Sequence, residues 1–168
     1  SPPMNSGLSM MRRLATEAVC IMPPGHPLEA LDEIGPADLI GVDLVLLGRQ
    51  RSLRLQIDQA FRQGRMMPQI KAEVHSVEMA CRLAAQGIGV SIVNGLFARL
   101  CLDMGIACRP FRPRIDYCVG MATLAGQPPH PLVPELVQRI LDAMARRAGP
   151  DAFTLLAPDD AAAPAAPA

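Results

Sequence analysis

The sequence predicts a globular α/β fold built on a largely parallel sheet. Half of its 168 residues are hydrophobic, which supplies enough apolar surface for one domain or for two small lobes. Short apolar runs alternate along the chain with amphipathic stretches of helical periodicity, which is the pattern of βαβ units. Glycines and prolines lie between these segments, where the chain must turn. Together these observations exclude general disorder.

The first elements are expected on either side of a proline-rich turn. The first dozen residues are rich in Pro, Ser and Gly and are expected to form a loop. A strand is predicted for 14–22, because its apolar run is short and prolines follow it directly. Residues 38–39 lie in a short helical turn that Gly41 ends. The apolar run 44–47 is typical of a buried parallel strand.

The middle of the chain alternates helix and strand. A helix is predicted from Ser52, which can act as its N-cap, to Gln63, with Gly64 as its stop. Arg54 and Asp58 lie four residues apart on its outer face, so we expect a solvated ion pair. The other elements expected here are strand 69–74, a helix that Ser76 caps and Gly87 ends, strand 88–93, helix 96–103 and strand 106–109.

The C-terminal part repeats the strand–helix pattern once. Residues 115–124 are predicted to form a strand, and 132–147 an amphipathic helix with Pro134 in its first turn. After Gly149 the chain is rich in Ala, Pro and Asp. We therefore expect 149–168 to be a disordered tail.

Composition limits the direct partners of this chain. Lys plus Arg and Asp plus Glu both number 16, so the basic excess typical of a duplex-binding surface is absent. Aromatic residues make up 3% of the chain, too few for a platform that stacks single-stranded bases. No apolar run approaches the roughly 18 residues of a membrane span, and the first residues do not resemble a secretory signal. We expect neither nucleic acid nor membrane as a direct partner.

The chemically reactive residues show no catalytic or metal-binding pattern. The three histidines lack metal-ligand spacing, no GxSxG nucleophile elbow occurs, and the adjacent His75 and Ser76 are not expected to form a catalytic pair. The five cysteines form no CxxC motif. We interpret them as reduced, mostly buried thiols of a cytoplasmic protein, with a Cys101–Cys108 redox pair as the alternative. The prediction is a protein that is not an enzyme and holds no metal or cofactor.

Five segments, taken together, resemble the effector-binding region of LysR-type transcriptional regulators. In chain order they are EAVCIMPPGHPL, DLIGVDLVLL, RSLRLQIDQAF, EVHSVEMACRLAAQGIGVSIV, and RPFRPRIDYCVGMAT with the helix that follows it. Each segment alone is weak evidence, but their order over 14–147 is that of the family. Within the family, the sequence is similar to regulators of opine and related amino-acid catabolism.

The resemblance implies a two-lobe, type 2 periplasmic-binding-protein-like fold, in which two α/β lobes joined by crossing strands enclose a small ligand. Lobe two is expected to be nearly complete and lobe one partial. Sheet edges and apolar helix faces of lobe one should therefore be exposed. The implied ranges are 1–41 for the remnant of lobe one and the crossover, 42–110 for lobe two, 111–148 for the returning part of lobe one and 149–168 for the tail.

The family also implies partners. The chain is expected to act as a homodimer or tetramer, with 69–86 as a subunit contact. DNA would be bound only through the family's N-terminal winged helix-turn-helix, which has no counterpart here because the sequence resembles an N-terminally truncated member. Ligand binding would act by favouring one subunit arrangement over another.

A ligand site is expected at the carboxyl ends of the lobe-two strands, where helix N-termini favour an anion. An arginine that binds a carboxylate bidentately would add specificity. We therefore predict a small carboxylate or amino-acid-like effector. The candidate contacts are Arg51, Ser52, Arg54, His75, Ser76, Ser91 and Asn94.

These candidates also have ordinary structural interpretations. Ser52 and Ser76 can be simple N-caps, Arg54 can be a partner of Asp58, and Asn94-Gly95 can be a turn that needs a positive φ. Two other functions stay open beside the sensor. A free-standing solute-binding protein of the same fold would need a signal peptide or lipid anchor. A small-molecule transferase would need an acid/base pair or a cofactor motif.

Overall fold

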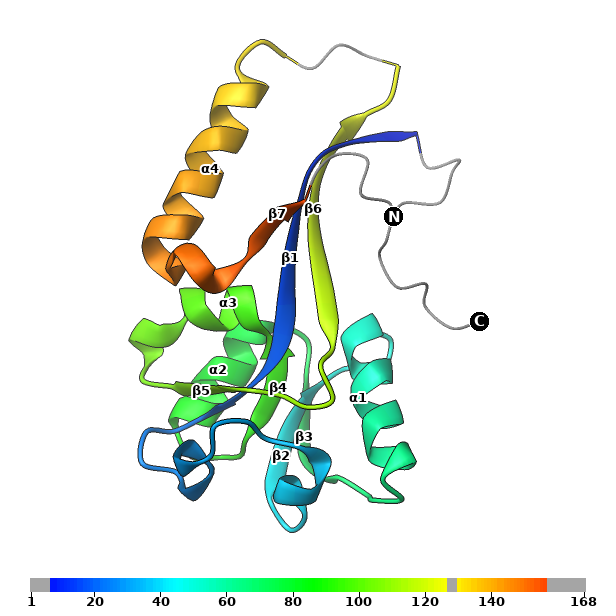
Figure 1. The fold of residues 1–168 in the computed structure, drawn as a ribbon, viewed down its shortest axis with the longest axis vertical. Coiled ribbons are helices and arrows are strands. Elements are labelled where there is room, and N and C mark those ends of the chain that lie inside the picture. The colour runs from blue at the N-terminus through cyan, green and yellow to red at the C-terminus, as the bar shows by residue number, and fades with distance from the viewer. Residues whose placement is uncertain (1–6, 127–129, 157–168) are drawn as a thin grey trace. The chain divides into compact units, whose positions relative to one another are not determined.

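The computed structural model describes residues 7–126 and 130–156 (Figure 1). They divide into two compact units, a larger one of Glu17–Tyr117 and a smaller one of Ser1–Thr16 with Cys118–Ala168. In chain order the elements are β1 (Leu8–Met22), β2 (Asp43–Leu47), α1 (Ser52–Gln63), β3 (Gln69–Val74), α2 (Val77–Ala85), β4 (Ser91–Asn94), α3 (Gly95–Leu100), β5 (Ala107–Pro110), β6 (Asp116–Leu124), α4 (Val133–Ala148) and β7 (Thr154–Leu156). Short 3₁₀ turns occur at Pro27–Ala30, Pro36–Leu39, Leu102–Met104 and Pro150–Ala152.

The larger unit is built on a mixed β-structure. β2 and β3 pair in parallel, and a parallel bridge between Leu44 and Val90 links β2 to the residue just before β4. β4 pairs antiparallel with β1, which also pairs antiparallel with β5. Since β2, β3 and β4 run in the same direction, their carboxyl ends lie at one edge.

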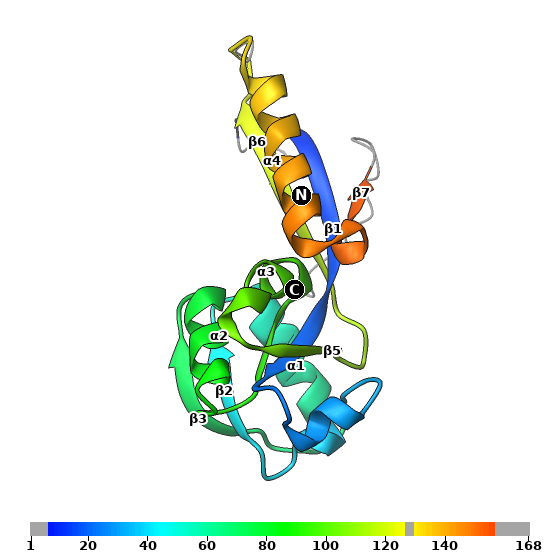
Figure 2. The same ribbon diagram turned by 90° about the vertical axis from the view of Figure 1, so that its left-hand side faces the viewer.

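Alternate side chains of these strands enter two separate cores. Leu44, Leu46 and Ile92 pack with buried residues of α1. Val45 and Val93 pack instead with buried residues of α2 and α3. Figure 1 shows α1 on one side of the strands and α2 and α3 on the other, and Figure 2 shows the side of α2 and α3. Burial on both faces explains why β2 is a nearly continuous apolar run.

The smaller unit combines the N-terminal half of β1 with β6, β7 and α4. β6 and β7 both pair with β1. The Thr16 hydroxyl is buried and donates a hydrogen bond to the Ala152 carbonyl oxygen at 3.2 Å. α4 buries Leu141 but leaves Leu136 largely exposed, as is Leu132 just before the helix. An exposed apolar helix face was expected for this part of the chain.

Two local predictions and one alternative interpretation were wrong. Residues 8–12 are not a loop, because β1 starts at Leu8 and continues along β6. The segment expected to be a disordered tail from residue 149 holds a 3₁₀ turn and β7, because β7 finds backbone partners on β1. The part of that prediction covering 157–168 lies outside the described residues. Asn94-Gly95 does not need a positive φ, since Asn94 is extended with φ −62° and leads directly into α3.

Candidate functional site

The candidate residues gather where β2, β3 and β4 end. The loop after β2 leads into α1, the His75-Ser76 turn follows β3, and Asn94 ends β4 just before α3. Because these strands are parallel, the three turns share one edge of the larger unit, as the sequence predicted. Ligands of open α/β sheets bind at such an edge, outside the carboxyl ends of the strands.

Arg51 joins the turns that follow β2 and β3. Its Nη2 atom donates a hydrogen bond to the His75 carbonyl oxygen at 3.2 Å, and both residues are exposed. The backbone N–H of Gly48 donates to Val74 O at 3.0 Å, which adds a second link. A guanidinium has several further N–H donors, and the Arg51 side chain is exposed to solvent. Arg51 can therefore contact an anion without leaving its backbone partner.

The predicted N-cap of α1 was wrong by one residue. Arg51 is the extended capping residue, with φ −83° and ψ 132°, and Ser52 is the first helical residue. Within the described part of the chain, no side chain caps this helix. The first N–H groups of a helix have no acceptor inside the helix, and they carry the positive end of its dipole. The N-terminus of α1 therefore favours an acceptor or an anion.

The environment of Arg54 differs from the solvated ion pair that we predicted. Its side chain is 2% exposed, because it points toward the end of β2 and not toward solvent. The predicted contact with Asp58 is present at 2.8 Å, but Nη1 also donates to Leu47 O at 2.8 Å and to Glu73 at 3.1 Å. Three acceptors of the protein thus engage this guanidinium, which fixes α1 to the ends of β2 and β3.

Glu73 is a functional-site neighbour that the sequence reasoning missed. Hydrogen bonds from Arg54 and then from Arg49 lower the pKa of its carboxyl below the ordinary range. The carboxylate form is therefore favoured, and it offsets part of the positive charge of the two arginines. Local spacing could not reveal this contact, because Arg54 and Glu73 are 19 residues apart in the chain.

Ser76 caps α2 as predicted. Its hydroxyl oxygen accepts a hydrogen bond from the Met79 backbone N–H at 3.2 Å, and its backbone is extended. The side chain is exposed. This is the ordinary capping arrangement, and it leaves the hydroxyl proton available as a donor.

Ser91 and Asn94 are buried in β4 and have unusual polar environments. Asn94 is 3% exposed, and its Oδ1 accepts a hydrogen bond from Phe97 N at 3.2 Å, which caps α3. Its Nδ2 and the Ser91 Oγ have no hydrogen-bond partner among the described residues. The residues are three apart in an extended strand, so they face opposite sides, with Asn94 on the side of Ile92 and α1. Such orphaned buried groups are rare, because each costs free energy.

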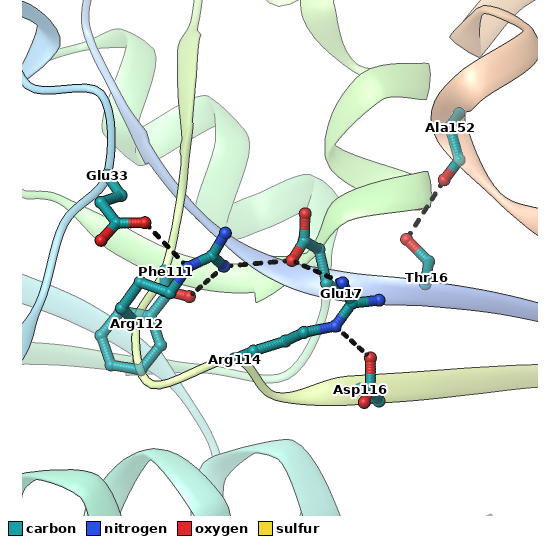
Figure 3. Close-up of polar contacts among 8 residues, drawn as sticks. All are labelled: Thr16, Glu17, Glu33, Phe111, Arg112, Arg114, Asp116 and Ala152. Atoms are coloured by element: carbon teal, nitrogen blue, oxygen red, sulfur yellow. Dashed lines mark hydrogen bonds and ion pairs between the residues drawn. The ribbon is translucent and has the colours of Figure 1, made fainter.

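A second polar cluster, which the sequence reasoning also missed, lies around Arg112 (Figure 3). Arg112 donates to Glu17 at 3.1 Å and to Glu33 at 2.9 Å. Arg114 donates to Asp116 at 2.7 Å and lies 4.0 Å from Glu17. The only advance signal was the arginine-rich stretch RPFRPR. Since carboxylates of the larger unit surround both arginines, the cluster ties β1 to the chain that leads into β6.

The described residues form no cluster suited to a metal ion. They include no group of three or more His, Cys, Asp and Glu side chains placed to hold a metal ion. In the same part of the chain, no helix combines the length and the apolar character needed to cross a membrane.

The fold and the edge described above define an α/β ligand-binding domain of the type 2 periplasmic-binding-protein-like class. The effector binding domain of QuiR, solved in complex with shikimate, superimposes with a TM-score of 0.61 at 19% identity, over 87% of this chain and 70% of that chain. The predicted fold class is confirmed. The family model for the LysR substrate binding domain matches residues 1–145, and the chain belongs to this family.

Curated relatives support the same assignment. The chain is 30% identical over 128 residues to the transcriptional activator protein LysR of Escherichia coli (strain K12), covering 76% of this chain and 41% of that protein. It is 32% identical over 127 residues to the regulatory protein NocR of Agrobacterium tumefaciens (strain T37), covering 76% and 42%. The chain thus spans about two-fifths of the length of these relatives.

Proposed function

We propose that this chain is the effector-sensing domain of a LysR-type transcriptional regulator, and that its effector is a small carboxylate or amino-acid-like molecule. The proposal rests on Asn94, which ends β4 at the edge where α1 begins. Its Nδ2 atom is buried and donates a hydrogen bond to no described residue. A buried donor without a protein acceptor is suited to an acceptor atom of a ligand. The QuiR domain was solved with shikimate, itself a carboxylate, which supports the ligand class.

The N-terminus of α1 supplies the second part of this site. Val90 forms a parallel bridge with Leu44, so the end of β4 lies beside the loop that leads from β2 into α1. By the alternation of side chains along β4, Asn94 is expected on the same face as Ile92, which packs with residues of α1. An oxygen bound by Nδ2 would therefore lie near the uncapped first turn of α1, where the helix dipole favours negative charge.

We propose that the effector is bound by Arg51 and not by Arg54. Arg54 is buried and already donates to three acceptors of the protein, so binding a ligand would leave Asp58 or Glu73 without its partner. Arg51 is exposed and bonded to one backbone oxygen. Ser52, His75 and Ser76 lie at the same edge, and we retain them as further candidate contacts of the effector. Ser91, another candidate contact, lies on the opposite face of β4.

The remaining functional assignments follow from the family. The named relatives are a transcriptional activator and a regulatory protein, which favours sensing over both catalysis and solute delivery to a transporter. We propose that the protein works in the cytoplasm as a homodimer or tetramer. The edge strand β3 and helix α2 would contribute a subunit contact. DNA would be bound by a separate winged helix-turn-helix domain.

Thermal unfolding with amino acids, opines and small carboxylates tests the proposal. A ligand that binds the folded state stabilises it by about 2.7 kcal/mol at a concentration of about 100 Kd, so the correct class raises the unfolding midpoint saturably. Asn94→Asp keeps an oxygen to cap α3 but replaces the donor by a carboxylate. We expect this variant to lose the midpoint shift with carboxylates.

Asn94→Ser is the matched control for this test. It also retains a capping oxygen, but it introduces no charge. We expect it to bind the same carboxylate about tenfold more weakly, the effect of one lost hydrogen bond of about 1.4 kcal/mol. Unchanged ligand-induced shifts in both variants would contradict the role of Asn94. A chain that responds to none of the compounds would contradict the effector class.

A further inference from the structure

A C-terminal strap, residues 149–156, closes one side of strand β1 in the smaller unit. It follows α4 and consists of a 3₁₀ turn and β7. β7 pairs antiparallel with Arg13, Leu14 and Ala15 of β1. β6 also pairs with β1, and Figures 1 and 2 show β1 between β6 and β7. The family model matches residues 1–145, so the strap is a feature of this chain beyond the matched region.

The chain reversal that starts the strap is set by Gly149. Its N–H donates to Ala145 O at 3.0 Å, which closes α4, and its φ of 90° and ψ of 156° lie in a region open essentially to glycine alone. Three residues later, the carbonyl oxygen of the buried Ala152 accepts the hydrogen bond from the buried Thr16 hydroxyl. Leu155 is 52% exposed, so its side chain adds little to the attachment of β7. The strap is therefore anchored at its start, and β7 depends mainly on backbone pairing.

Removing the strap would open a strand edge. The backbone groups of β1 that now pair with β7 would lose their partners, and an open edge is a template for another strand. A second copy of the chain presents the same edge. Antiparallel pairing of the two copies centred on Leu14 places Arg13 opposite Ala15 and Arg12 opposite Thr16, so no two of these arginines face each other directly. This register is self-complementary, as an interface with twofold symmetry requires.

We propose that the strap keeps this edge of β1 closed to self-association, and that its release lets two copies of the chain pair antiparallel through β1. In the intact chain the strap is tethered beside its site at an effective concentration on the order of millimolar, so it excludes a second copy at lower concentrations of protein. Without the strap, the second copy supplies the backbone partners that β7 provides in the structure. This pairing is separate from the effector site and from the subunit contact proposed for β3 and α2.

Two shortened chains test the proposal. One ends at Leu156 and keeps the strap, whereas the other ends at Gly149 and keeps the residue that closes α4. Sedimentation velocity over a series of concentrations measures their association, and any association of the longer chain is the baseline. We expect the shorter chain to double its mass relative to the longer one, with a dissociation constant for that step at least about tenfold lower, which corresponds to about 1.4 kcal/mol. Equal association of two folded chains would overturn the proposal.

Substitutions at Ala15 in the chain that ends at Gly149 distinguish strand pairing from general aggregation. In the proposed register Ala15 of each copy stands opposite Arg13 of the other. Ala15→Lys therefore brings like charges together twice, and Ala15→Glu brings opposite charges together twice. We expect the lysine variant to associate about tenfold more weakly than the glutamate variant. Equal association of the two variants would overturn the pairing through β1.

A variant of the full chain covers the case in which the shorter chain does not fold. Thr154→Pro combined with Leu155→Pro removes two successive N–H groups of β7, and one of them faces β1 because they alternate in direction. Circular dichroism shows whether this variant is folded, and we expect it to associate as the chain ending at Gly149 does. Hydrogen exchange of the assembled variant should be slow at 13–16, where the second copy covers β1. A folded variant that does not associate, or fast exchange at 13–16 in the assembly, would overturn the proposal.

Discussion

Arg54 Nη1 donates a hydrogen bond to the carbonyl oxygen of Leu47 at 2.8 Å. Leu47 is the last residue of β2, and Arg54 lies in the first turn of α1, so the bond closes the loop between them. The same guanidinium reaches Asp58 within α1 and Glu73 in β3. A residue that looks like half of a surface ion pair therefore holds the framework on which the candidate site is built.

Replacing Arg54 should cost much more stability than replacing Arg49. In Arg54→Leu, Leu47 O loses a buried donor, and Asp58 and Glu73 lose a partner whose side chain is only 2% exposed. Breaking a fully buried pair costs about 3–5 kcal/mol, and we expect a smaller loss of about 2–3 kcal/mol because both carboxylates retain access to water. Denaturant unfolding monitored by circular dichroism measures the loss.

Arg49→Leu is the matched control, because Arg49 binds the same Glu73 carboxylate from an exposed position. Exposed ion pairs contribute about 0–1 kcal/mol, so its effect should be small. Equal losses in the two variants would show that burial of Arg54 adds nothing.

Glu73 should make stability depend on pH in the acid range. Its folded pKa is lowered from the ordinary value of 4.5, chiefly by the hydrogen bond from Arg54. The unfolded chain therefore binds a proton at higher pH than the folded chain, so this stabilisation is fully present well above pH 4.5 and is lost as the pH falls through the folded pKa. Glu73→Gln should flatten the fall of the unfolding midpoint below that pH.

The control for this titration is Glu78→Gln. Glu78 pairs with Arg82 four residues along α2, and both side chains are well exposed. We expect the unfolding midpoint of this variant to change with pH as that of the unchanged protein does, between about pH 6 and about pH 3, since exposed pairs contribute little to stability. A Glu73→Gln profile as steep as that of the unchanged protein would contradict the assignment.

The sequence predicted those elements that short-range patterns define. The helical periodicity of 52–63 placed α1, and Ser76 placed the start of α2, because periodicity and capping are local properties. β7 and the first residues of β1 were missed for the opposite reason. Their regular structure depends on strand partners that lie far away in the chain.

The candidate site was predictable in its place but not in its chemistry. The order of parallel strands was enough to gather Arg51, His75 and Asn94 at one edge. The burial of Arg54 could not be predicted, since Asp58 is its neighbour in sequence whereas Glu73 and Leu47 O become its neighbours only on folding. The orphaned Nδ2 of Asn94 depends in the same way on everything packed around it.

Ser91→Ala should leave the protein as stable as before or stabilise it by about 1 kcal/mol, because the buried Oγ has no hydrogen-bond partner in the described chain and its burial is uncompensated. The matched control is Thr16→Val, which removes a buried hydroxyl that does donate, to Ala152 O at 3.2 Å. That variant should lose about 1–2 kcal/mol. Thermal unfolding of both variants decides the matter, and a clear loss in Ser91→Ala would mean that its hydroxyl is satisfied in the folded protein.

Gly89→Ala should destabilise the larger unit strongly, because Gly89 lies against the backbone of β2. An added Cβ would stand 2.6 Å from Asp43 O and 3.2 Å from Val45 Cγ2. Asp43 O also accepts the hydrogen bond from Val90 N at 2.9 Å that links β2 to the start of β4, so β2 cannot yield without weakening this link.

We expect Gly89→Ala to lose about 2–3 kcal/mol in denaturant unfolding, the upper part of the range of about 1–3 kcal/mol for overpacking a close-packed site. Gly48→Ala is the control, since the nearest atom to its added Cβ is His75 Nδ1 at 4.0 Å. This second variant should change the free energy of unfolding by no more than about 1 kcal/mol. The change is a gain in stability if the main effect of the alanine is to restrict the unfolded chain. Equal losses of stability in the two variants would show that close contact between Gly89 and β2 does not require a glycine.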